Sequence, residues 1–236
     1  MRRDYFIFGG VNSLDFGVIL QEAPVESLPE PENEYVSVPG RNGDLLRPGG
    51  RWKNIKVSYS GAIVTNLAEN FGALRQRMLS QAGYQRLEDT LHPEWYRMAA
   101  LSGGVDPALT PYNRAGTFAL TFSAKPQRYL KTGETPIQVE TGQILHNPWM
   151  PALPLIRVTG NGDGQLVVGS STITITGLEG GITIDSDTQN VYDDARNLNN
   201  SISVVGGFPT LSTGKTAVSF SGGITAVQIT PRWWTI

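Results

Sequence analysis

Two histidines are the first candidates for acid–base chemistry in this 236-residue chain. His92 is followed at once by a proline, and His146 is followed by one after a single intervening residue. A hydrolytic triad needs a base, an orienting acid and a nucleophile, and no Gly-x-Ser-x-Gly elbow accompanies either histidine. The sequence contains no cysteine, which excludes thiolate–zinc sites, thiol nucleophiles and a disulfide framework. We therefore expect both histidines to flank turns or to lie at an interface, and we predict no catalytic residue.

Acidic side chains gather at Asp185 and Asp187 and, further on, at Asp193 and Asp194. Two interpretations compete: a calcium site made of loop oxygens, or turn residues whose carboxylates bond to their own backbone. The spacing lacks the regularity of a Ca²⁺ loop, so the turn interpretation is favoured and no metal is predicted. A glycosidase carboxylate pair depends on a spatial separation that spacing alone does not give. The segment lacks the surrounding aromatic and amide residues of such a site.

The stretch at residues 160–164 (GNGDG) has the composition of a phosphate-cradling loop. It joins a predicted strand to another strand, so the helix N-terminus that would hold a phosphate is missing. We predict a turn at this place and no cofactor.

The chain ends in an aromatic segment in which Trp233 and Trp234 follow Arg232. Adjacent residues of a strand point to opposite faces, so one indole can enter the core while the other stays at the surface. An exposed Trp beside an Arg is typical of interfaces and also of sugar-stacking platforms. We predict Trp233 and Trp234 as a peripheral contact; the alternative is an edge strand that only caps the domain.

Composition favours a mainly β protein and excludes several classes of partner. The chain has 27 Gly and 15 Pro with 17% charged residues, and these two residue types are the poorest helix formers and common turn residues. A net charge of −2 gives no basis for gripping nucleic acid. No segment is apolar over the length of a membrane span, and no signal-peptide core follows the N-terminus. We expect no sequence-specific nucleic acid and no membrane partner, and synthesis in a cytoplasm.

Alternating apolar residues predict strands in the first half of the chain, most clearly at residues 55–59 and 117–122. One helix is predicted at about residues 67–81. Asn66 is its expected N-cap, with Glu69 three residues later, and Gly83 can end it. Its apolar stripe consists of Leu67, Phe71, Leu74 and Met78.

The second half of the chain is rich in Thr, Ile, Val, Gly, Ser and Asn, and turn signals separate about seven short strands. This regular spacing is typical of a β-sandwich. We place the domain boundary near residue 130, which gives domains at 1–130 and 131–236. The predicted strands are residues 155–159, 165–168, 172–176, 181–185, 201–205, 216–220 and 226–233.

Residues 21–51 have little core of their own. Residues 21–34 contain three Pro and five Glu and predict an extended, acidic surface segment. Asn-Gly at residues 42–43 suits a turn with both central residues at positive φ, which predicts a hairpin with its tip at residues 41–44. Residues 47–53 (RPGGRWK) predict another turn.

Several short motifs, taken in order, resemble the distal tail (Dit) proteins of long non-contractile-tailed phages and prophages of Gram-positive hosts. The resemblance covers nearly the whole chain, and no single motif is specific. In the first half the motifs are residues 8–13 (FGGVNS) and 38–43 (VPGRNG). In the second half they are residues 147–148, 154–162, 182–186, 207–209 and 229–233.

The resemblance implies an N-terminal β-sandwich with one helix and an extended hairpin arm, and a C-terminal galectin-like β-sandwich. It further implies a six-fold ring around a channel for DNA, at the tail tip of the virion. Its partners would be the tail tube protein and the tail-associated, fibre or receptor-binding proteins. The family has no catalytic residues, so no enzyme is predicted, and "galectin-like" describes a fold without licensing sugar binding.

An arm that pairs with a neighbouring subunit would explain residues 21–51, because edge strands are ready pairing surfaces and a heterologous contact can close a ring. The alternative function is a carbohydrate-binding module for attachment to the host cell wall, which would act through Trp233 or Trp234. A hydrolase is disfavoured by the sparse histidines. The predicted interface residues of the arm are Tyr35, Val36, Val38, Arg41, Leu45 and Leu46.

Overall fold

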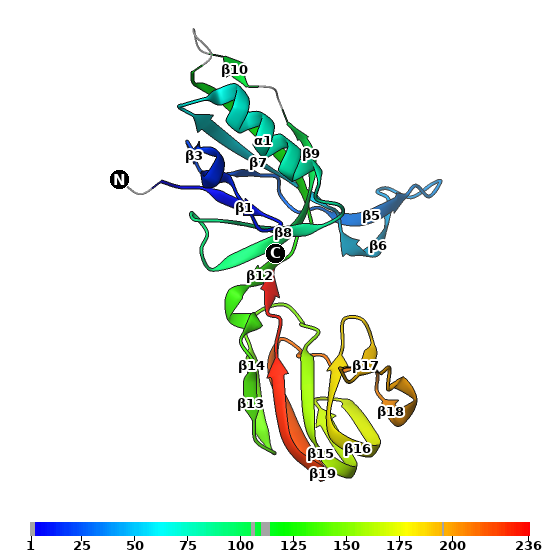
Figure 1. Cartoon of the computed structure of the whole chain (residues 1–236). Helices are drawn as coiled ribbons and strands as arrows, with labels where there is room; N and C mark the ends of the chain where they lie inside the picture. Colours follow the sequence, from blue (N-terminus) through cyan, green and yellow to red (C-terminus); the bar gives the residue numbers. More distant parts are fainter. Residues whose placement is uncertain (1–2, 105–106, 110–113, 195) are drawn as a thin grey trace. The chain divides into compact units, whose positions relative to one another are not determined.

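The computed structural model describes residues 3–104, 107–109, 114–194 and 196–236 (Figure 1). Over these residues the prediction of a mainly β protein is confirmed, and one α-helix is present. The chain divides into two compact units, residues 1–128 with residue 236 and residues 129–235, and each has its own apolar core. None of the helices in the described part is long and apolar enough to cross a membrane.

Unit 1 is built on an antiparallel sheet with the strand order β2-β1-β8-β9-β11-β7-β3. In addition, β4 pairs with β7, and β10 pairs with β11. A short 3-10 helix, η1, spans Ser13–Phe16. The strands are β1 (Phe6–Phe8), β2 (Val11–Asn12), β3 (Val18–Leu20), β4 (Val25–Glu26), β7 (Ile55–Ile63), β8 (Gln85–Asp89), β9 (Trp95–Gly104), β10 (Ala108–Leu109) and β11 (Gly116–Ala124).

This sheet curls back on itself around the core of unit 1. In a flat sheet β1 and β7 would lie about 19 Å apart, because neighbouring strands are spaced by roughly 4.8 Å. The ring centroids of Phe6 and Tyr59 are nevertheless 5.2 Å apart, and those of Phe8 and Phe122 are 5.0 Å apart. The alternation predicted at residues 55–59 and 117–122 is confirmed, since the apolar residues of both segments are buried in this core.

The helix α1 (Leu67–Leu79) lies against the sheet of unit 1 (Figure 1), and its predicted stripe is buried as expected. The predicted N-cap is wrong: Asn66 has φ 50° and ψ 47°, and its side chain makes no capping hydrogen bond. A capping side chain needs an extended backbone at that position, which a left-handed residue does not have. The helix ends at Ser80, whose N–H donates to the Gln76 carbonyl, before Gly83 is reached.

A separate two-stranded ribbon projects from unit 1, made of β5 (Pro31–Val36) and β6 (Leu45–Trp52) (Figure 1). The turn predicted at residues 47–53 is wrong, because most of that segment belongs to β6. Gly49 and Gly50 form a bulge there: Gly50 has φ +72°, and a Cβ on Gly49 would lie 2.3 Å from the Glu32 carbonyl oxygen. We call residues 28–54 the arm.

Unit 2 contains a seven-stranded antiparallel sheet with the main order β13-β19-β15-β16-β17; β14 also pairs with β19, and β18 with β16. Two further short strands, β12 and β20, pair with each other. The strands are β12 (Arg128–Leu130), β13 (Ile137–Val139), β14 (Gln143–Asn147), β15 (Leu155–Val168), β16 (Ser171–Asp185), β17 (Asn190–Tyr192), β18 (Ile202–Val205), β19 (Gly214–Thr230) and β20 (Trp234–Thr235). The 3-10 helices are η3 (Lys131–Glu134) and η4 (Asn199–Ser201).

Three long strands, β15, β16 and β19, form both layers of unit 2 because each bends in its middle. The turn predicted at residues 160–164 is wrong, and so is the break between the predicted strands at residues 216–220 and 226–233. The glycines at both places lie inside β15 and β19, where the pairing register shifts. A Cβ on Gly160 would lie 2.0 Å from the Gly223 carbonyl oxygen, so only glycine lets the two backbones meet. Both halves of each bent strand contribute to a single core.

Candidate interaction site: the arm and its anchor

The arm has two unlike faces. Residues paired across an antiparallel ribbon lie on the same side, and successive residues alternate between sides. Tyr35 pairs with Leu46, and Pro31 pairs with Trp52, on one side of the ribbon. Tyr35 is 67% exposed, Leu46 49% and Trp52 41%, so three large apolar side chains face solvent together. We call this side the apolar arm face.

The opposite side of the arm carries cross-strand ion pairs, and at its distal end the exposed apolar pair Val36–Leu45. Glu34 pairs with Arg47 at 3.6 Å, and Glu32 pairs with Arg51 next to the bulge. Nearer the root of the arm, the ammonium group of Lys53 lies 3.8 Å from the carboxylate of Glu30, and the backbone N–H of Lys53 donates to the Glu30 carbonyl. These exposed pairs connect β5 to β6 and leave the apolar side of the ribbon without charge partners.

The structure brings the predicted arm residues together at the distal end of the ribbon. Residues 35–36 pair with residues 45–46, and the N–H of Arg41 donates to the Val38 carbonyl in the connecting turn. Trp52 was missed, because its segment was taken for a turn. The sequence did hold a signal for the partner strand β5, since Glu occupies every second position from residue 30 to residue 34.

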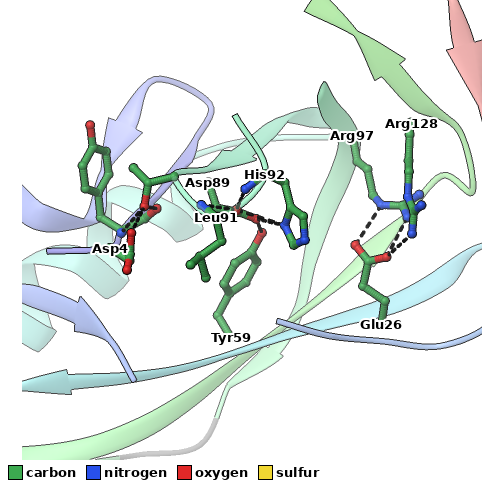
Figure 2. Close-up of polar contacts among 10 residues, drawn as sticks. Asp4, Glu26, Tyr59, Asp89, Leu91, His92, Arg97 and Arg128 are labelled. Carbon is green, nitrogen blue, oxygen red and sulfur yellow. Dashed lines mark hydrogen bonds and ion pairs between the residues drawn. The ribbon is translucent and has the colours of Figure 1, made fainter. Parts of the chain in front are cut away.

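The arm leaves unit 1 at a buried ion-pair cluster, shown on the right of Figure 2. The carboxylate of Glu26, at the end of β4, accepts hydrogen bonds from Arg97 at 2.9 Å and from Arg128 at 2.8 Å. Arg97 also donates to the Pro126 carbonyl at 2.6 Å, and its side chain is only 2% exposed. Immediately after Glu26, the N–H of Ser27 donates to the Lys56 carbonyl, which closes the root of the arm.

Charge keeps this anchor ionised. Burial raises the pKa of Glu26, but the hydrogen bonds and charges of Arg97 and Arg128 outweigh burial and hold that pKa below its ordinary value. Burial lowers the pKa of Arg97, and the Glu26 carboxylate opposes this effect. Both guanidinium groups lie near the indole of Trp95: that of Arg97 is 5.1 Å and that of Arg128 is 4.9 Å from the ring centre.

A pH dependence follows from the Glu26 anchor. A carboxylate whose pKa is lowered by folding stabilises the protein above its ordinary pKa, and this stabilisation is lost as the pH falls through the lower folded pKa. We expect the unfolding free energies of the wild type and of Glu26→Gln to differ most above the ordinary pKa of a Glu carboxyl and to converge as the pH falls through the lower pKa of the folded state. Urea unfolding at several pH values measures this difference. A difference that stays constant over the range would contradict the assignment.

Asp89 forms a second buried polar cluster, in the centre of Figure 2. Its carboxylate accepts hydrogen bonds from the Tyr59 hydroxyl at 2.7 Å and from the N–H groups of Leu91 at 2.9 Å and His92 at 2.7 Å. The imidazole of His92 lies 3.1 Å from Asp89 and stacks on Trp95. Burial, and then the Asp89 charge, raise the pKa of Tyr59. The prediction that His92 flanks a turn is confirmed.

The acidic residues of unit 2 also serve turns. The Asp185 carboxylate accepts from the N–H groups of Asp187 at 3.0 Å and Thr188 at 3.4 Å, which confirms the turn interpretation. Arg232 donates to both of its oxygens, at 2.7 Å and 3.1 Å. Burial raises the pKa of Asp185, and the bonds to Arg232 and the backbone outweigh burial and lower it. Among the described residues, no group of three or more potential ligands could hold a metal ion.

The two C-terminal tryptophans lie differently from the prediction. Both Trp233 and Trp234 are half-buried and pack against the core of unit 2, and the indole N–H of Trp234 donates to the Pro151 carbonyl at 2.9 Å. The expected split between a core and a surface indole is wrong, because β20 begins at Trp234, so Trp233 and Trp234 do not alternate along one strand. A peripheral contact at these residues stays a prediction. In this unit Trp149 is the more exposed indole, at 40%.

The fold of this chain, over both units, is similar to that of a phage protein of known structure. It matches the crystal structure of the SPP1 Dit protein with a TM-score of 0.74, over 97% of this chain and 98% of that one. The chain has the Dit fold. The resemblance noted in the sequence is thereby confirmed at the level of the fold, although only 12% of the aligned residues are identical.

The SPP1 Dit protein is described as a paradigm of the hub of the adsorption apparatus in phages that infect Gram-positive bacteria. Two structures of the phage P2 baseplate in its activated conformation, one with Ca and one with Sr, also match the Dit fold of this chain. Their TM-scores are 0.52 and 0.50, with 11% identity and coverage of 97% of this chain and 98% of theirs. No protein-family model matches the sequence, and no curated protein matches it. The similarity therefore lies in the fold.

Proposed function

We propose that this chain is a structural subunit of a phage tail tip, of the Dit type, that assembles with itself into a hexameric ring. The ring joins the tail tube protein to the baseplate or to tail-associated, fibre or receptor-binding proteins. The fold supports this assignment, because the SPP1 protein that shares it belongs to an adsorption hub and the phage P2 chains belong to a baseplate. The role requires no catalytic group and no cofactor.

The apolar arm face is the observation that carries the ring. Burial of a large apolar side chain stabilises a complex by about 1.5–3 kcal/mol, and the arm leaves three of them in solvent. Tyr and Trp are enriched in interface centres, which is the composition of this face. An arm that docks on the next copy makes a heterologous contact, and such contacts close into rings when the rotation allows it.

The ring would surround a channel through which DNA passes. A net charge of −2 is compatible with such a passage, because a protein that surrounds DNA without gripping it needs no patch of clustered Lys and Arg. In this proposal the subunit is made in the host cytoplasm and is carried in the virion at the tail tip.

Oligomeric mass tests the proposal. Static light scattering on the purified chain is expected to give six times the 25.6 kDa chain mass, or a multiple from stacked rings. The hexamer should persist on dilution to concentrations at which weak association is lost. A monomer mass at every accessible concentration would count decisively against the ring.

A further inference from the structure

One outward-facing row of polar side chains crosses all five strands of one layer of unit 2. Gln138 of β13 pairs with Gln228 of β19, which pairs with Arg157 of β15. Arg157 pairs in turn with Thr183 of β16, and Thr183 with Tyr192 of β17. At roughly 4.8 Å per strand the row extends over about 19 Å. We call these five residues the polar row.

The side chains of the polar row point away from the core. Their chain neighbours Val139, Val158 and Val227 are buried, so the alternation of the strands places the row on the outer side. Gln138, Arg157, Gln228 and Tyr192 are exposed, and Thr183 is half-buried. Part of the row borders a shallow hollow of about 190 Å³ lined by Gln138, Arg157, Thr159, Ala226 and Gln228.

Three members of the row have free hydrogen-bonding capacity. Within the part of the chain that the structure describes, the amides of Gln138 and Gln228 and the guanidinium of Arg157 enter no hydrogen bond or ion pair. Each amide offers donors and an acceptor, and the guanidinium offers several donors in one plane. Such groups match vicinal hydroxyls, each of which both donates and accepts. No carboxylate belongs to the row, so Arg157 can also attract an anionic substituent.

The outer side of the opposite layer has a different chemistry. Ile144 is 57% exposed there and Val205 67%, on the edge strands β14 and β18. Interface cores between proteins are depleted in charged residues and rich in apolar ones, and that side fits such a contact better than the polar row does. The polar row instead combines amides, hydroxyls and a guanidinium with one aromatic ring at its end.

We propose that the polar row binds a glycan: the amides and Arg157 hydrogen-bond to its hydroxyl or acidic groups, and the Tyr192 ring packs on the apolar face of a sugar. This gives unit 2 a ligand class that the ring assignment does not supply. It also places sugar binding away from Trp233 and Trp234, whose indoles are committed to the core of unit 2.

A glycan microarray with neutral, carboxylated and phosphorylated bacterial polysaccharides tests the proposal. We expect the full-length chain to bind at least one polysaccharide, and Arg157→Ala/Gln228→Ala to weaken that binding by about tenfold or more. If only carboxylated or only phosphorylated polysaccharides bind, that result supports the proposal and identifies the acidic group that Arg157 recognises. The matched control is Gln165→Ala, because Gln165 lies in the second half of β15, on the outer side of the opposite layer, and is exposed.

Three results would overturn this proposal. One is an absence of binding to every polysaccharide on the array, and another is equal binding by the polar-row variant and the wild type. The third is that the chain binds a protein or peptide and no glycan, and that the polar-row variant loses this binding. Thermal melting of each variant confirms that unit 2 is folded, and light scattering on the same samples reports ring assembly separately.

Discussion

Replacement of the three large side chains of the apolar arm face, by Tyr35→Ser, Leu46→Ser and Trp52→Ser together, is expected to convert the proposed ring into monomers. Each side chain contributes about 1.5–3 kcal/mol when it goes from full exposure to full burial, and the three are 41–67% exposed in the free chain. The combined loss therefore weakens each subunit contact by a factor of about 50 or more. Both units should remain folded, because none of the three residues belongs to either core. Sedimentation velocity measures the change in mass.

The matched control for the arm variant alters the other side of the same ribbon. Glu34→Gln with Arg47→Gln removes an exposed ion pair, whose two side chains are 63% and 77% exposed, and leaves the apolar arm face intact. Exposed pairs contribute little to stability, so this variant should still form the ring. If the triple variant sediments as the wild type does, the arm is not the subunit contact.

Loss of the carboxylate that anchors the arm is expected to give the largest stability effect. Glu26→Gln leaves Arg97 as a buried cation with weakened compensation, and breaking a buried ion pair in this way costs about 3–5 kcal/mol. At roughly 4 °C per kcal/mol, the melting temperature of unit 1 should fall by about 12–20 °C. Differential scanning calorimetry measures the change.

Glu34→Gln is the control for the anchor variant, since it makes the same chemical change in an exposed pair. Its melting temperature should stay within about 4 °C of the wild type. Equal melting temperatures for Glu26→Gln and Glu34→Gln would mean that the buried cluster does not stabilise unit 1.

The sequence was sufficient wherever burial follows a local period. The stripe of α1 and the alternation in β7 and β11 depend only on which residues of one segment face the core, and a period of 3.6 or 2 shows this directly. Phe71 and Tyr59 could be placed in the core for this reason. The prediction of Asn66 as the helix N-cap was wrong although it is also a local feature, because the left-handed backbone of Asn66 prevents capping and the residue type does not reveal that backbone conformation.

Glycine was the least reliable signal for turns, because it also occurs at bulges and bends within strands. Gly49, Gly160 and Gly223 lie inside continuous strands, where each meets a carbonyl oxygen of a partner strand within about 2 Å of where a Cβ would stand. That partner is distant in the sequence, and no local pattern records the contact. A segment rich in glycine was therefore taken for a turn when it was a bend in a long strand.

The anchor of the arm could not be predicted for a related reason. Glu26 meets Arg97 across 71 residues and Arg128 across 102 residues, and only the curled sheet brings the three together. In the sequence Glu26 is one of several glutamates in an acidic surface segment. A hairpin in this segment was predictable, but the turn expected at Asn42 and Gly43 is wrong, because Asn42 is not at positive φ and the hydrogen-bonded turn runs from Val38 to Arg41. The difference between the two faces depends on the register of β5 against β6.

Negative-stain electron microscopy of the purified full-length chain tests the central claim most directly. We expect ring-shaped particles with six-fold symmetry and a central opening, and the loss of these rings in the Tyr35→Ser, Leu46→Ser, Trp52→Ser variant. Fields of single small particles from the wild-type chain, at concentrations where the protein is pure and folded, would contradict it.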